Sequence, residues 1–356
     1  MYNKILLNAY LVNNLGDDLF ISIICNRFKN VLFYIKESEP YTNVFKTISN
    51  VRICSQESIL ENKFDLQIMI GGSLFMQPKN ICNIYSKYES VKNTRVFLDI
   101  PFIIIGANFG PYTKIDHFTL YKSWFSALDD ICFRDYQSYN MFKELSNIRW
   151  APDVIFNYKL KTNIPNQVKA ISISCIYNNQ RIGLHEYSQE DYFKTLAKIS
   201  IYYIKKGYTI KFGAFCSYQG DLLAIYKILE YIPSVYHSKI RILEYTGYNL
   251  NVFLSDFLNT EYIIGTRFHS IILGWLANIP VFPIVYNLKT YNAIKSYGFK
   301  GNYVNIESVN CCNLDFISSN NDKNYRLNCT NLIKKSNLQF RFLDNFYSKG
   351  KIIEGV

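Results

Sequence analysis

Short apolar runs, each followed by turn-forming residues and then by a helix-like stretch, recur through most of this chain. Residues 5–11, 65–70 and 102–105 are such runs, and glycine-rich turns follow the last two. Strands that are apolar on both faces are typical of a parallel sheet covered by helices on both sides. The pattern therefore predicts an α/β protein with parallel sheets.

The alternation of predicted strands and helices is interrupted once and becomes weaker near the end of the chain. Residues 157–165 are polar and end in a proline, as a linker would. A second alternating set of strands and helices starts at residue 170 and weakens after about residue 301. We predict one α/β domain over residues 1–160, a second over residues 166–312, and a tail over residues 313–356 that packs back on the first domain.

The composition limits the classes of binding partner but does not distinguish among those that remain. Of 356 residues, 49% are hydrophobic and 19% are charged, which excludes a disordered chain. Lys and Arg number 39 against 28 Asp and Glu, giving a net charge of +11. This excess suits an anionic substrate, an anionic membrane surface or nucleic acid. Nucleic acid has no support beyond charge, because no nucleic-acid-binding motif occurs.

The sequence favours a cytoplasmic protein. Its first residues lack the pattern of a cleaved signal peptide, and no stretch is apolar enough to span a membrane. The nine cysteines are an odd number without a C-x-x-C pair. This arrangement suits neither a common zinc site nor a disulfide framework, so we expect reduced thiols.

The most informative cluster is Gly265-Thr266-Arg267-Phe268-His269-Ser270, which follows a predicted strand and begins a helix. Backbone N–H groups at a helix start bind phosphate or carboxylate groups. Arg267 can hold such an anion through two hydrogen bonds, and His269 can move a proton near neutral pH. The structural alternative is that Thr266 or Ser270 caps the helix, Arg267 is a surface charge and His269 is a core residue.

Two further cations follow predicted strands. Lys289 follows the predicted strand over residues 281–285 and should reach the same sheet edge as His269. There it could contact phosphate or remain a solvated surface lysine. Arg134 follows the apolar run 131–133, and a charge there needs a partner, either Asp135 or a ligand.

Three loops are placed where a ligand could meet the backbone, although the two glycine loops among them can also be ordinary tight turns. Asn14, Gly16 and Asp17 form a turn in which Gly16 allows close ligand approach and Asp17 is either a helix cap or a base. The other two loops contain Gly71, Gly72 and Ser73, and Asn108. Ligands of open α/β sheets bind beyond the carboxyl ends of the strands. Two halves facing each other would therefore bring all the clusters into one interdomain cleft.

In this order the clusters resemble those of the polysaccharide pyruvyl transferase family. The most specific matches are Thr266-Arg267-Phe268-His269-Ser270, the Arg134-Asp135 pair with Ser138, and the downstream Lys289. The matching stretches run from residue 14 to residue 289, and the tail carries none of them. There is no G-x-G-x-x-G after the first strand, no P-loop and no metal-binding motif.

The resemblance implies two Rossmann-like domains of the GT-B type, the first on the acceptor side and the second on the donor side. It implies transfer of pyruvate from phosphoenolpyruvate to two hydroxyls of a sugar, with release of phosphate. His269 would be the general acid, and Asp17 a base or an acceptor contact. The donor would be held by Arg134, Arg267, Lys289 and Ser270, and the acceptor or cleft side would include Asn14, Gly16, Gly71, Gly72, Ser73 and Asn108. No cofactor or metal is expected, because these cations can neutralise the phosphate.

The main alternative is a GT-B-type glycosyltransferase with a nucleotide-sugar donor. Residues 262–289 contain no Asp or Glu to hold a ribose, which favours the pyruvyl transferase. The expected acceptor is a surface polysaccharide or its lipid-linked precursor, at the inner face of the plasma membrane. The tail is a candidate for peripheral contact with anionic lipid through Lys334, Lys335, Phe340, Arg341, Phe342, Phe346, Lys349 and Lys351. The acceptor sugar, the ketal stereochemistry and the oligomeric state stay open.

Overall fold

The computed structural model describes residues 3–160, 168–177 and 187–353. The chain forms two compact units. Unit 1 comprises Met1–Leu11, Leu19–Tyr158 and Thr330–Val356. Unit 2 comprises Val12–Asp18 and Lys159–Cys329.

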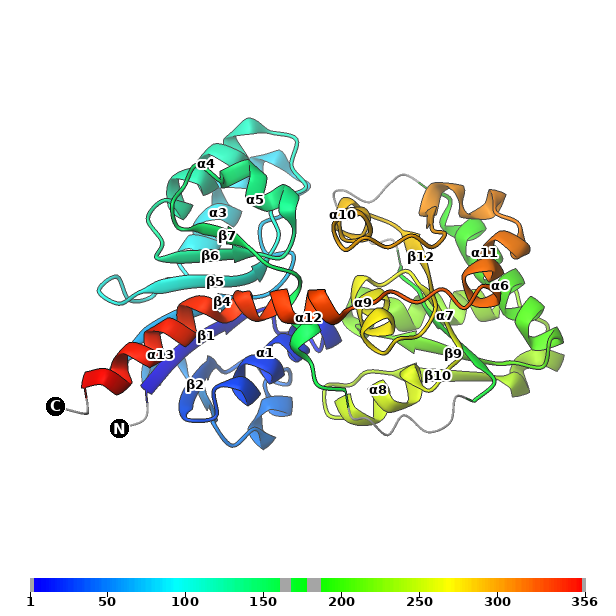
Figure 1. Cartoon of the computed structure of the whole chain (residues 1–356), viewed down its shortest axis with the longest axis horizontal. Coiled ribbons are helices and arrows are strands. Elements are labelled where there is room, and N and C mark those ends of the chain that lie inside the picture. Colours follow the sequence, from blue (N-terminus) through cyan, green and yellow to red (C-terminus); the bar gives the residue numbers. More distant parts are fainter. Residues whose placement is uncertain (1–2, 161–167, 178–186, 354–356) are drawn as a thin grey trace. The chain divides into compact units, whose positions relative to one another are not determined.

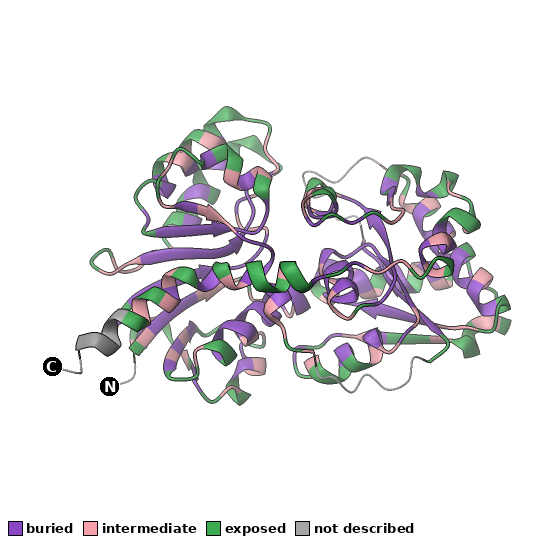
Figure 2. Ribbon diagram, in the orientation of Figure 1, coloured by how far each residue is buried: buried purple, intermediate pink, exposed green. Residues whose placement is uncertain are grey.

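Unit 1 is built on a seven-stranded parallel sheet of order β3-β2-β1-β4-β5-β6-β7 (Figure 1). The central strands β4 (Leu66–Ile70) and β5 (Phe102–Ala107) are buried along their whole length, as Figure 2 shows. The remaining strands are β1 (Asn3–Ala9), β2 (Val31–Lys36), β3 (Val51–Cys54), β6 (Asp130–Phe133) and β7 (Ile148–Trp150). The helices are α1 (Leu15–Arg27), α2 (Gln56–Glu61), α3 (Ile84–Lys92), α4 (Ile115–Phe125), α5 (Tyr136–Phe142), α12 (Thr330–Ser336) and α13 (Arg341–Ile353).

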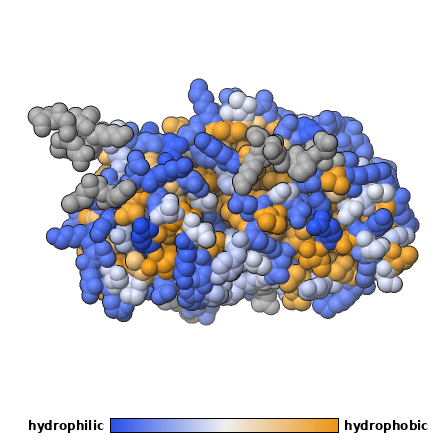
Figure 3. Space-filling model, turned by 90° about the horizontal axis from the view of Figure 1, so that it is seen from below, coloured by the Kyte–Doolittle hydropathy of each residue, from blue (hydrophilic) through white to orange (hydrophobic). Residues whose placement is uncertain are grey.

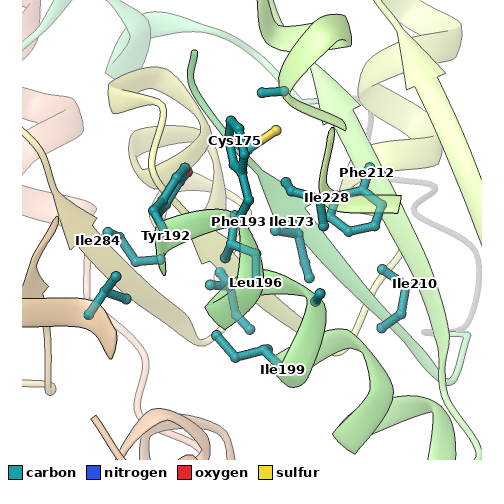
Figure 4. Close-up of a cluster of buried hydrophobic side chains, with 14 of the residues drawn as sticks. Ile173, Cys175, Tyr192, Phe193, Leu196, Ile199, Ile210, Phe212, Ile228 and Ile284 are labelled. Carbon is teal, nitrogen blue, oxygen red and sulfur yellow. The ribbon is translucent and has the colours of Figure 1, made fainter. Parts of the chain in front are cut away.

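Unit 2 repeats this plan with a parallel sheet of order β10-β9-β8-β11-β12-β13. Its strands are β8 (Ala170–Ser174), β9 (Thr209–Ala214), β10 (Ile240–Glu244), β11 (Tyr262–Gly265), β12 (Val281–Val285) and β13 (Val304–Asn305). Its helices are α6 (Gln189–Lys205), α7 (Asp221–Leu229), α8 (Leu250–Leu258), α9 (Phe268–Leu276), α10 (Leu288–Ser296) and α11 (Leu314–Asp322). Figure 4 shows one face of the core, where Leu196 of α6 packs with Ile173 of β8 and Ile210 of β9.

In both sheets the first strand of the unit lies inside, with later strands added on either side of it. This is the order of a Rossmann-like sheet. The predicted α/β class with two parallel sheets is therefore confirmed. The short strands β3, β7 and β13 are additions to the strands that the sequence predicted.

The limits of the two units differ from the predicted domains at two places. Residues Val12–Asp18 belong to unit 2, because the Leu15 N–H donates to the carbonyl of Phe215 at 3.1 Å and the Cys216 thiol contacts the carbonyl of Val12. The tail of unit 1 begins at Thr330, not at residue 313, because α11 packs against β12 of unit 2. Part of the predicted linker, residues 161–165, lies outside the described residues.

The tail carries buried side chains into unit 1. Phe340 and Leu343 have no exposed surface, so Phe340 is a core residue and is not available to a membrane. Lys334, Lys335 and Arg341 are exposed. The side chains of Lys349 and Lys351 lie outside the described part of the tail.

No helix in the described part of the chain is both long enough and apolar enough to cross a membrane. On the face drawn in Figure 3, hydrophobic residues lie in patches that hydrophilic residues separate.

Candidate active site

The turn between β11 and α9 carries the cluster that the sequence singled out. The backbone N–H groups of Thr266 and Arg267 donate to the hydroxyl of Ser174 at 3.0 and 3.1 Å. Ser174 ends the neighbouring strand β8, and its hydroxyl also lies 2.6 Å from that of Ser270. Two of the backbone N–H groups that the sequence analysis considered for anion binding therefore donate to a buried serine. Ser270 has no exposed surface either.

Arg267 is locked in place by a carboxylate that the sequence did not single out. Its Nε donates to both oxygens of Asp221, at 2.9 and 2.8 Å, and its Nη2 also bonds Asp221. Its Nη1 donates to Gln219 at 2.6 Å. Burial alone would lower the pKa of Arg267, but the Asp221 carboxylate outweighs it and the pKa is raised. Arg267 is therefore a charged, oriented group whose charge Asp221 partly balances.

Asp221 is itself held by the backbone. Its Oδ2 accepts the N–H groups of Phe215 and Cys216, both at 3.0 Å. Asp221 begins α7 just beyond the carboxyl end of β9, a position like those of the predicted clusters. Its position after a predicted strand is the sequence feature from which Asp221 could have been predicted.

His269 lies against the backbone of Gly16. A Cβ atom on Gly16 would lie 1.6 Å from Nδ1 of the imidazole and 2.1 Å from its Cε1, far closer than atoms can approach. Only glycine therefore permits this contact. Of the two nitrogens of the half-buried ring, Nδ1 is the nearer to this Cβ position and Nε2 the farther.

Lys289 lies beside the same turn. Its ammonium group is 5.6 Å from the ring centre of Phe268 and 5.9 Å from that of Tyr286. Lys289 belongs to the first turn of α10, which Asn287 caps through the N–H of Thr290. The cation and His269 thus lie at the carboxyl ends of the adjacent strands β12 and β11, as predicted.

The residues before α1 and the first turn of that helix bring two carboxyl groups to unit 2. Asp17 is 9% exposed, and Asn14 accepts the N–H of Gly16 at 3.2 Å. The sequence placed this loop on the acceptor side of the first domain, whereas the structure packs it on unit 2 against His269. The physical reason is the backbone hydrogen bond from Leu15 to Phe215.

Asp18 is the second carboxyl group, and the sequence analysis missed it. Its Oδ2 accepts the hydroxyl of Tyr245 at 2.7 Å, while its buried Oδ1 has no hydrogen-bond partner among the described residues. Burial raises the pKa of Asp18 from 3.8 to about 8; the Tyr245 hydrogen bond opposes the rise and the charge of Asp17 adds to it. Asp18 is therefore largely protonated at neutral pH.

Arg134 belongs to unit 1, with the predicted residues of the two other loops. Its Nη1 forms an ion pair with Asp153 at 3.0 Å, and its Nη2 donates to Asn108 at 2.6 Å. A Cβ atom on Gly72 would lie 2.6 Å from the guanidinium, so this glycine also permits a close contact. The carboxylate partner is Asp153 and not Asp135, because Asp135 caps α5 through the N–H and hydroxyl of Ser138.

Gly71 and Ser73 flank this contact. The N–H of Gly71 donates to the carbonyl of Ile105 at 3.3 Å, and the hydroxyl of Ser73 lies 3.4 Å from Oδ1 of Asn108. The predicted residues thus form two groups, each within one unit. Within the described residues, no three His, Cys, Asp or Glu side chains gather as metal ligands.

Comparison with known proteins adds a family and a fold. A family model described as polysaccharide pyruvyl transferase matches residues 9–287. A search of the curated proteins finds no match.

Several solved structures share the fold. HepE from Anabaena, in complex with UDP and glucose, is 10% identical with a TM-score of 0.57, over 100% of both chains. UDP-GlcNAc 2-epimerase from Methanocaldococcus jannaschii is 12% identical with a TM-score of 0.56, over 97% of this chain and 100% of that one. The calicheamicin glycosyltransferase CalG4 is 10% identical with a TM-score of 0.52, over 99% of each chain. These likenesses show the fold alone, which is that of two Rossmann-like domains of the GT-B type.

Substituting Gly16→Ala should displace the His269 ring, because a methyl group cannot share its space with the imidazole. NMR of the histidine side chains should show a changed chemical shift and titration curve for His269. The resonances of His117 and His237, which lie elsewhere in the fold, serve as internal controls and should not move. A His269 resonance identical to that of the wild type would contradict the contact.

Substituting Asp18→Asn should remove a pH-dependent loss of stability. The folded wild type keeps a proton on Asp18 up to about pH 8, whereas the unfolded chain releases it near pH 4, so wild-type stability falls as pH rises through this window. The asparagine cannot ionise and still accepts the Tyr245 hydroxyl. Urea unfolding at successive pH values should measure this change. Within the window, the free energy of unfolding of the variant should rise relative to that of the wild type by roughly 1.4 kcal/mol per pH unit. A difference that does not vary with pH would refute the protonated state.

Proposed function

Because the chain belongs to the polysaccharide pyruvyl transferase family, we propose that it transfers pyruvate from phosphoenolpyruvate to two hydroxyls of one sugar. The product is a cyclic ketal, and phosphate is released. The reaction class, a transferase acting in polysaccharide synthesis, follows from the family. The donor and the residue roles below are our proposal.

The donor is a small polyanion, with one carboxylate and a phosphate that carries about −1.5 to −2 charges. Lys289 and Arg267 are the proposed contacts for it in unit 2. Arg267 is 9% exposed, and Asp221 and Gln219 hold its guanidinium in one orientation. A cation fixed before the donor arrives needs little reorganisation as charge moves to the departing phosphate.

The proposed reaction begins with protonation of the donor. His269, as the imidazolium, gives its proton to the methylene carbon, whose double-bond electrons form the new C–H bond and leave an oxocarbenium-like carbon. One sugar hydroxyl attacks that carbon and its proton restores the imidazolium. The bond to the phosphate oxygen then breaks, and the second hydroxyl attacks in its place. Asp17 is the proposed base for this hydroxyl, whose proton ends on the released phosphate.

The contact between His269 and Gly16 is the observation that carries this proposal. A general acid must present one ring nitrogen to the substrate in a fixed orientation. Nδ1 is the ring atom nearest to the Cβ position of Gly16, so Nε2 is the ring nitrogen farther from this residue. We therefore assign Nε2 as the atom that donates the proton.

Arg134 of unit 1 is a further proposed contact for the donor. It is 2% exposed, and Asp153 and Asn108 fix both of its terminal nitrogens. A charge so deeply buried needs such partners, which are also the groups that aim it. The predicted acceptor or cleft residues Gly71, Gly72, Ser73 and Asn108 surround it in unit 1.

We further propose that the acceptor is a surface polysaccharide or its lipid-linked precursor, and that the enzyme works at the inner face of the plasma membrane. The exposed Lys334, Lys335 and Arg341 of the tail are the proposed contacts with anionic lipid. Phe340 is excluded from this surface by its burial.

The direct test is to incubate the protein with phosphoenolpyruvate and a panel of lipid-linked and synthetic galactosides, glucosides and mannosides. Phosphate release that depends on one acceptor, together with a mass gain of the acceptor corresponding to a pyruvate ketal, is expected. A nucleotide-sugar glycosyltransferase would instead release UDP from a UDP-sugar and ignore phosphoenolpyruvate. That result would replace our proposal with the alternative.

Substituting His269→Ala should lower kcat by about 10²–10⁴-fold, the usual contribution of a general acid. The matched control is His237→Ala, which should keep wild-type turnover. His237 is exposed and lies in unit 2 before the amino end of β10. Donor binding, measured by calorimetry, should persist in both variants. Normal ketal formation by His269→Ala would remove the acid role.

A further inference from the structure

We propose that Gln339, in the C-terminal tail, is a positioning residue for Arg134. Gln339 has no exposed surface. Its Oε1 accepts the N–H of Gly106 at 3.0 Å. Its Nε2 lies 2.8 Å from the carbonyl of Ala151, 3.1 Å from that of Pro152 and 3.3 Å from that of Phe133. One side chain thus joins the carboxyl ends of three neighbouring strands.

Each of these backbone contacts lies beside a residue of the Arg134 cluster. Phe133 precedes Arg134, and Pro152 precedes Asp153. Gly106 stands two residues before Asn108. Because Asp153 and Asn108 bind the guanidinium directly, a shift of these strand ends would change the position of Arg134 and of both its partners.

The sheet itself creates the need for Gln339. The register between β5 and β6 shifts between Ile105 and Ala107, and Gly106 has a φ of 76°. Such a bulge turns one backbone N–H out of the ladder, and a buried N–H without an acceptor is costly. Gln339 Oε1 supplies that acceptor, so the bulge next to Asn108 depends on the tail.

The tail is fastened on both sides of Gln339. Arg149, paired with Asp130 at 2.7 Å, donates to the carbonyls of Leu338 and Gln339. Farther along, Arg27 forms an ion pair with Asp344 at 2.9 Å. The tail lies beyond residues 9–287, the stretch that matches the family model. The family match therefore assigns no role to Gln339.

The test compares Gln339→Glu with Gln67→Glu. Gln67 is a matched control, since it is equally buried in unit 1 and pairs with the backbone N–H of Val96 and the carbonyl of Phe97. It lies in β4, away from the Arg134 cluster. A carboxylate at residue 339 keeps the acceptor for Gly106 but faces three carbonyl oxygens without a donor. Both variants should lose stability, whereas only Gln339→Glu should move the strand ends.

The activity readout rests on the proposed function. At a temperature where both variants are folded, Gln339→Glu should lower kcat/KM for phosphoenolpyruvate by about 10–100-fold, as small misplacements of binding groups do. Lowering the pH should restore part of this loss, because a neutral carboxylic acid can donate as the amide does. Gln67→Glu should stay within about twofold of the wild type. Equal kcat/KM values for the two variants would overturn the proposal.

A second readout does not need catalysis. Modification of Arg134 by phenylglyoxal, followed by mass spectrometry, should be slow in the wild type and in Gln67→Glu and at least several-fold faster in Gln339→Glu. If the wild type transfers no pyruvate, the proposed function fails and this labelling alone decides the positioning role. If Gln339→Glu does not fold, Gln339→Asn, which is shorter by one methylene group, takes its place in both measurements. Unchanged labelling in the folded variant would refute the inference.

Discussion

The close contact of the His269 imidazole with Gly16 sets the position of the proposed proton donor. It requires a residue without a side chain at position 16 and a loop that leaves β1 to pack on unit 2. The Leu15–Phe215 backbone bond and the Tyr245–Asp18 hydrogen bond hold that loop. The orientation of the proposed proton donor is therefore set by a segment more than 250 residues earlier in the chain.

Both arginines of the proposed donor site are buried and paired with carboxylates. Asp221 holds Arg267, and Asp153 holds Arg134. Such pairs contribute little to stability once desolvation is counted, but they fix a guanidinium in one place. Their proposed role is orientation. Lys289 has a different environment, because its ammonium group lies near the rings of Phe268 and Tyr286. Gln339 is proposed to orient Arg134 in a similar way, by bonding the backbone next to it and to its partners.

The sequence predicted the class of fold, and the placement of the candidate residues after strand ends, because both depend on local patterns. Continuous apolar runs marked β4, β5 and β12, and the residues after the strands marked His269, Lys289 and Arg134. It could not pair Arg267 with Asp221 or assign residues 12–18 to unit 2, since those contacts join segments far apart in the chain. Asp18 was hidden for another reason: its raised pKa comes from burial, which only the packed structure reveals. Gln339 lies between Leu338 and Phe340, and nothing in that local sequence marks it as a buried side chain that bonds the backbone of other strands.

The origin of the third hydrogen of the ketal methyl group shows whether an exchangeable group on the protein protonates the donor. With the reaction run in D₂O and an acceptor found by phosphate release, the account predicts one deuterium in that methyl group, because an exchangeable group on the protein protonates the donor. Mass spectrometry of the product measures it. A methyl group without deuterium would contradict protonation by His269 and with it the mechanism proposed for this fold.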